Sequence, residues 1–248
     1  MVGIICSPYF WALVAALLPA VLLFLYIYNQ DSINPEPIKW LWKGVWYGVL
    51  SAVIVVTVLG LFFDTDAWSA DIPIPVVRAI LDAFFCAAIP EETAKLIMLW
   101  LLLRKNPYFD EHLDGIVYAT CVGLGFAGFE NIFYVIGNME NLVSIAVVRG
   151  LFSVPGHFFF AVAMGYFISL ACFKSRTEIE KKKYYLLAFL VPMILHGIFD
   201  TLLMVSSVDE SLAGICIIAF LYFTNKLRKK GQERIHQLKL FDENSKRK

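Results

Sequence analysis

Seven apolar stretches follow one another along the 248-residue chain, separated by short polar segments. Each reaches or approaches the roughly 20 residues that a helix needs to cross a bilayer. The pattern predicts spans at residues 9–28, 44–63, 76–103, 115–136, 141–173, 184–206 and 211–227. The expected fold is therefore all-α: a polytopic transmembrane helix bundle of about seven to eight spans, forming a single integral membrane domain over residues 1–248.

Two of the predicted spans are longer than a bilayer requires. Residues 76–103 and 141–173 would measure about 40–50 Å as straight helices. The hydrocarbon core is about 30 Å thick. Both spans must therefore tilt, bend or contain a break, and Pro90 and Pro155 are the expected bend sites, because proline removes a backbone donor and clashes with the preceding turn.

Composition supports a membrane protein. The chain is 59% hydrophobic and 17% charged, with a mean hydropathy of +0.69. Soluble domains carry about 25% charged residues. The formal net charge is zero, so nothing favours a nucleic-acid partner, and the lipid bilayer is the expected surrounding. The apolar N-terminus lacks a basic leader segment and is interpreted as a retained membrane helix.

The distribution of Lys and Arg predicts the orientation. The loops that contain them are 29–43, 104–114, 174–183 and the basic tail 226–248, whereas 64–75, 137–140 and 207–210 contain none. The two kinds alternate, and cytoplasmic loops are the positively charged ones. The prediction is an outside N-terminus and a cytoplasmic C-terminus. The tail is expected to lie along the anionic inner surface or to lack fixed structure.

Polar and ionisable residues recur inside four of these spans. They are Glu91, Glu92 and Lys95 in the third, Glu130 and Asn131 in the fourth, Arg149 and His157 in the fifth, and His196 and Asp200 in the sixth. An ionisable group at a helix centre costs about 2.5–3.5 kcal/mol on the insertion scale, so such residues are functional candidates. At helical rise, the acids and histidines fall about 17–24 Å above the inner surface, in one layer.

These residue types suit hydrolysis. A carboxylate and an imidazole that share a water form a general base, and a second imidazole can hydrogen-bond a developing oxyanion. A divalent metal such as zinc is a possible cofactor, with Glu92, Glu130, His157 and His196 as candidate ligands. No HExxH motif is present. An ion- or proton-coupled transporter and a non-catalytic scaffold with structural acids remain alternatives.

The polar residues of the spans lie in four motifs, in this order along the chain: "EETAK", "DGIVYATCVGLGFAGFENIFY", "RGLFSVPGH" and "HGIFD". Together they resemble the PrsW family of bacterial intramembrane proteases, which is related to the type II CAAX prenyl endopeptidases. The resemblance covers about residues 76–204, which would form the protease core. It implies an endopeptidase of the bacterial inner membrane that cleaves a single-pass membrane protein of the anti-sigma factor type on its extracytoplasmic side.

The resemblance also implies roles for individual residues. Glu91 and Glu92 would be the catalytic acids, His157 would share water activation, and His196 with Asp200 would line the oxyanion site. The supporting residues would be Lys95, Glu130, Asn131 and Arg149. The related prenyl endopeptidases have Arg and Asn where this chain has Lys95 and Asp200, so an enzyme of that type is an alternative. Water must reach Glu91, so a polar cavity open to the outer half is expected.

Overall fold

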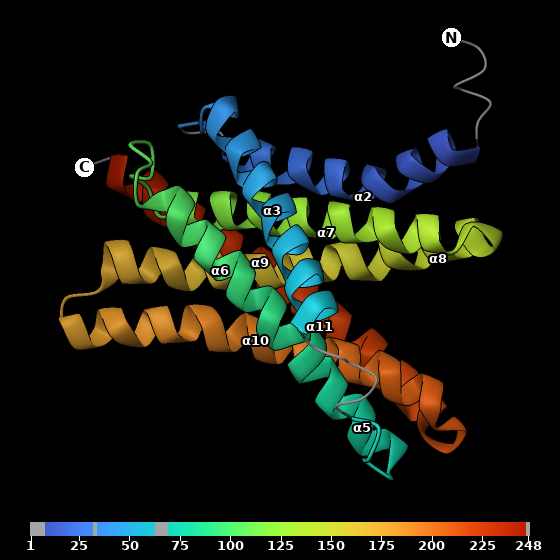
Figure 1. The fold of residues 1–248 in the computed structure, drawn as a ribbon. Coiled ribbons are helices and arrows are strands. Elements are labelled where there is room, and N and C mark those ends of the chain that lie inside the picture. The colour runs from blue at the N-terminus through green and yellow to red at the C-terminus, as the bar shows by residue number, and fades with distance from the viewer. Residues whose placement is uncertain (1–7, 32–33, 63–68, 247–248) are drawn as a thin grey trace.

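The computed structural model describes residues 8–31, 34–62 and 69–246, and this part of the chain is helical without any strand (Figure 1). The helices are α2 (Pro8–Gln30), α3 (Ile38–Phe62), α5 (Pro75–Asp82), α6 (Ile89–Leu103), α7 (Asp114–Gly137), α8 (Leu142–Val148), α9 (Val154–Ser169), α10 (Glu178–Val208) and α11 (Glu210–Lys246). Six helical stretches within it are long and apolar enough to cross a membrane. The predicted all-α polytopic bundle is confirmed.

The third predicted span is one interrupted helix. α5 and α6 are joined by the π-helical turn Ala83–Ala88, and α6 carries Pro90 in its first turn. The same arrangement recurs where the π-helical turn Arg149–Ser153 precedes α9 and Pro155. In each case a backbone N–H bonds five residues back, from Ile89 to Phe84 and from Val154 to Arg149. The expected interruptions are thus present as wide turns directly before the prolines.

Helix α7 lies at the centre of the bundle and contacts α2, α3 and α9. Glycines bring two of these helices unusually close. A Cβ atom at Gly48 of α3 would lie 2.0 Å from the carbonyl oxygen of Val122, and one at Gly125 of α7 would lie 2.0 Å from that of Val45. The glycine-rich part of α7 therefore serves close helix packing, which membrane bundles commonly build from small residues.

The C-terminal tail differs from the prediction. The alternative of a tail without fixed structure after residue 226 is wrong, because α11 continues as one helix to Lys246. Leu238 and Ile235 are buried, and a Cβ at Gly231 would lie 2.3 Å from the ring of Phe159. Asp242 accepts backbone hydrogen bonds from His112 and Leu113 just before α7. The apolar residues of this helix, such as Ile235 and Leu238, are interspersed with basic ones in the sequence, so the face that packs on the bundle was not recognised.

The helix ends fall into two groups (Figure 1). The ends of α2, α6 and α9 lie toward the left of the view, together with the C-terminus. The starts of α2 and α5 and the turns from α7 to α8 and from α10 to α11 lie toward the right and lower right. The first group carries the Lys- and Arg-containing connections, so the charge alternation seen in the sequence separates the two ends of the bundle.

Candidate active site

The first turn of α6 supplies the acids of the site. Glu91 and Glu92 follow Pro90 in the first turn of α6. Lys95 lies one turn further on, so its side chain returns to both acids. Its Nζ is 2.8 Å from Glu92 Oε1 and 3.4 Å from Glu91 Oε2. All three residues are buried.

Helix α9 brings His157 to this group. Lys95 Nζ donates to His157 Nδ1 at 3.0 Å, and the other ring nitrogen lies 3.0 Å from Glu130 Oε2 of α7. Arg149 Nη2 lies 2.8 Å from the same Glu130 oxygen, while its Nε donates to Asn131 Oδ1 at 2.8 Å. The chain of contacts ends at α2, because Asn131 donates to the carbonyl oxygen of Ala16.

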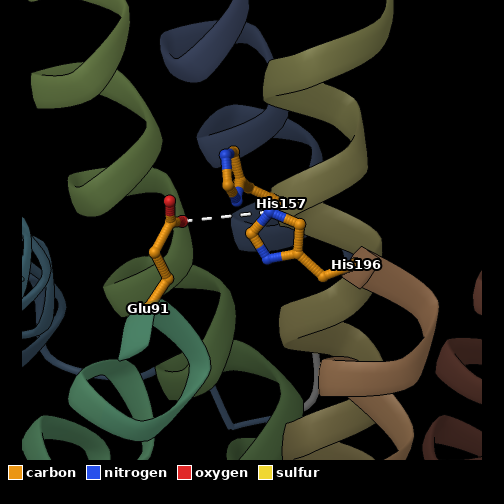
Figure 2. Close-up of side chains that lie close together, drawn as sticks. All are labelled: Glu91, His157 and His196. Atoms are coloured by element: carbon orange, nitrogen blue, oxygen red, sulfur yellow. Dashed lines mark ion pairs between the residues drawn. The ribbon is translucent and has the colours of Figure 1, made fainter. Parts of the chain in front are cut away.

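Helix α10 completes the site with His196 and Asp200, one turn apart. His196 Nδ1 lies 2.9 Å from Glu92 Oε1, and its Nε2 is 3.2 Å from Asp200 Oδ2 and 4.0 Å from Glu91 Oε2. Figure 2 shows Glu91, His157 and His196 converging from α6, α9 and α10. The structure thus joins all of the site residues expected from the sequence into one network.

Aromatic rings form a wall of the site that the sequence did not reveal. Phe160 stacks on His196 with ring centroids 4.9 Å apart. Lys95 Nζ lies 4.0 Å from the centre of the Phe126 ring, and Arg149 lies 3.8 Å from that of Tyr134. Aromatic residues are ordinary in membrane spans, so nothing in the pattern marked these three. Their rings limit rotation of the imidazole and hold the two cations in place.

A cavity of about 250 Å³ opens beside the network. Its lining includes Glu91, His157 and His196 with Glu130, Arg149 and Asp200, and it continues past Tyr134, Leu203, Met204 and Phe220. Glu92 and Lys95 do not line it. Glu92 is fully buried, and its Oε2 has no hydrogen-bond partner in the described part of the chain. The two neighbouring acids therefore differ, because Glu91 faces the cavity and Glu92 faces the protein.

The side chains at the cavity fit a metal ion. One ligand atom each of Glu91, His157 and His196 lies within 4.8 Å of the others. Two imidazoles and one carboxylate are a known ligand set of catalytic zinc. The carboxylate ligand in this set is Glu91, whereas the sequence had suggested Glu92 and Glu130 as the acidic metal ligands. Both imidazoles have a carboxylate on a ring nitrogen, an arrangement that orients metal-binding histidines. His157 would have to give up its bond from Lys95.

The fold and the site define a polytopic membrane protein with a hydrolase-type cluster of acids and imidazoles inside the bundle. Residues 36–225 match the family described as PrsW family intramembrane metalloprotease. The chain is 38% identical to Protease PrsW of Oceanobacillus iheyensis over 76% of this chain and 81% of the relative. It is 31% identical to Protease PrsW of Clostridioides difficile over 77% and 78% of the two chains, and 31% identical to that of Bacillus subtilis over 76% and 81%.

No solved structure matches the chain. The family match covers most of the sequence and the relatives align over more than three quarters of it. The chain belongs to the PrsW family of intramembrane metalloproteases. It is a membrane-embedded protease, and the resemblance inferred from four motifs is confirmed.

Proposed function

We propose that Glu91 and His157 activate the water that hydrolyses a peptide bond, and that His196 stabilises the oxyanion that develops. The observation that carries this proposal is the convergence of Glu91 and the two imidazoles on one cavity inside the bundle. A carboxylate and an imidazole at such a distance can both contact one water molecule, which is the geometry of general-base catalysis. If a divalent metal is bound, Glu91, His157 and His196 would hold it in place of those roles, and the ion would supply Lewis acidity and lower the pKa of its bound water.

The neighbouring residues hold this arrangement in place. Glu92 accepts from Lys95 and faces His196 Nδ1, which leaves His196 Nε2 directed toward Glu91 and Asp200. An acid beside a developing oxyanion is repulsive, so we assign Asp200 to holding His196 Nε2 in the resting site, from which this N–H turns to the oxyanion as the charge develops. Glu130 orients His157 in the same way and is itself held by Arg149. Asn131 anchors Arg149.

We further propose that the protease lies in a bacterial cell membrane with its N-terminus outside and its C-terminus in the cytoplasm. The segregation of Lys and Arg to one group of helix ends supports this orientation. Cysteine labelling tests it in a background without other cysteines. Asp71→Cys is expected to react from outside, and Arg176→Cys only after permeabilisation; both native side chains are exposed. The opposite labelling pattern would reverse the topology.

The proposed substrate is a single-pass membrane protein of the anti-sigma factor type, cut near its extracytoplasmic end. Beyond the catalytic residues, the cavity is lined by Tyr134, Leu203 and Met204, which come from the last turns of α7 and α10. In the proposed orientation these turns lie toward the outside. A substrate segment that unwinds at the outer surface then has a short path to Glu91.

Moving the cleavage sequence along a model single-pass substrate tests the proposal. With the purified enzyme in liposomes, we expect cutting when the sequence lies at the outer membrane boundary and none with the Glu91→Gln variant. Preferred cutting at the inner boundary would overturn the proposed entry side and favour an enzyme like the prenyl endopeptidases. Cutting by Glu91→Gln at the wild-type rate would overturn the site assignment.

A further inference from the structure

A second group of carboxylates lies at the opposite end of the bundle from the cavity mouth. Asp31 follows α2, Glu36 precedes α3, Glu111 lies between α6 and α7, and Asp114 begins α7. One carboxylate oxygen each of Asp31, Glu111 and Asp114 lies within 4.8 Å of the others. Asp31 and Glu36 are 3% exposed and Asp114 is fully buried. None of the four belongs to the active site.

The hydrogen bonds made inside this group leave one oxygen without a partner. Asp31 Oδ2 accepts from the Glu36 backbone N–H at 3.0 Å, and Tyr118 donates to Glu36. Asp114 Oδ2 accepts from the backbone N–H groups of Asp110 and Glu111. Asp114 Oδ1 is buried and has no hydrogen-bond partner within the described residues. A buried carboxylate oxygen without a partner is costly, so this atom points to a missing ligand.

Few positively charged side chains lie near these carboxylates to balance their negative charge. Lys246 Nζ lies 2.7 Å from Glu111 Oε1, but this lysine side chain is 44% exposed and water screens its charge. The carboxylates of Asp31, Glu111 and Asp114 lie within 4.8 Å of one another, and a bound cation would offset the repulsion between them.

We propose that Asp31, Glu111 and Asp114 bind a hard divalent cation, Mg²⁺ or Ca²⁺. All available ligand atoms are oxygens, and these ions take carboxylate, carbonyl and water oxygens. The bound cation would tie the end of α2 and the connection between α6 and α7 to the start of α7. The inference stands apart from the proposed catalytic mechanism, because it uses different residues on different segments.

Thermal unfolding of the purified full chain in detergent tests this site. The protein is first treated with a chelator and then titrated with MgCl₂ or CaCl₂ at constant ionic strength, so that the two ions are compared directly. At a cation concentration about 100-fold above the Kd, we expect the unfolding temperature to rise by about 5–10 °C. Asp31→Asn should remove this rise. The matched control is Asp209→Asn, since Asp209 caps α11 at the other end and Asn also caps helices well.

Because Asp31→Asn removes a buried charge whatever its role, a second variant separates the two explanations. Lys246→Gln removes an ammonium that competes with the cation for Glu111. If the site binds cations, the cation affinity of Lys246→Gln should rise several-fold. A merely structural ion pair would leave the titration midpoint unchanged. The proposal is overturned if wild-type protein shows no saturable response, if Asp31→Asn keeps the response, or if Lys246→Gln titrates like wild type.

Discussion

The two carboxylate clusters of this protein differ in how their charge is balanced. Inside the bundle, the acids contact cationic or imidazole side chains from α6, from the π-helical turn before α9, and from α9 and α10, and these contacts lie between 2.8 and 4.0 Å. At the other end, Asp31, Glu36 and Asp114 accept mainly backbone N–H and hydroxyl bonds. A buried charge needs a counter-charge. We infer that the first cluster contains its own counter-charges and that the second binds a counter-ion from solution.

The largest expected effect separates the two neighbouring glutamates of the first cluster. Glu91→Gln should reduce proteolysis by about 100-fold or more, because a general base typically contributes 10²–10⁴-fold. Its stability should change little, since Glu91 faces the cavity. Glu92→Gln should lose activity as well, but it should also unfold at a lower temperature, because Lys95 and His196 then lose a fully buried partner.

Cleavage rates and unfolding temperatures of the two variants are measured on the same preparations. Asp209→Asn serves as the control for removal of a carboxylate outside the site. If both variants cleave at the wild-type rate, the first cluster is structural. If Glu91→Gln is as destabilised as Glu92→Gln, the distinction between a cavity-facing and a protein-facing acid is wrong.

The next effect compares one lysine from each cluster. Lys95→Met leaves Glu91 and Glu92 without their buried counter-charge, so we expect a loss of about 3–5 kcal/mol in the free energy of unfolding. Lys246→Met removes a half-exposed partner of Glu111, and its loss should stay below about 1 kcal/mol. Denaturant unfolding in detergent, with chelator present, gives both values. Equal losses would mean that the two clusters do not differ in internal compensation.

The smallest effect concerns Asp242. This acid lies near the second cluster, but its carboxylate already accepts hydrogen bonds from neighbouring residues. It accepts from the backbone N–H groups of His112 and Leu113, and His112 Nδ1 lies 2.8 Å from its Oδ1. Asp242→Asn should lower the free energy of unfolding by about 1–2 kcal/mol, because the hydrogen bonds lose their charged acceptor. The exposed Glu233→Gln should have no measurable effect. A loss of cation binding in Asp242→Asn would show that this acid also belongs to the cation site.

The sequence predicted the helices and the first cluster but not the second. Charged residues such as Glu91 and His196 stand out in apolar spans, and helical rise places them at one depth. Asp31, Glu36 and Glu111 lie in connecting segments, where acids are common, so only the folded chain shows that they meet and are buried. The docking of α11 was missed for a related reason. The apolar residues Ile235 and Leu238 are interspersed with charged ones, and the partner surface comes from distant segments.

The wide turn before α6 has a consequence for how length changes affect this protein. A π-helical turn contains one residue more than the α-helical turn it replaces, and such turns are frequent at functional sites. Deleting one residue within Ala83–Ala88 would restore a regular helix from α5 into α6. Because the wide turn takes up the extra residue, this deletion would leave α5 on nearly the same face relative to Glu91. Deleting one residue from the α-helical part of α5 would instead rotate the segment before it by about 100° relative to Glu91, since an α-helix has 3.6 residues per turn. The span should therefore tolerate the loss of a residue within Ala83–Ala88 better than the loss of one within Pro75–Asp82.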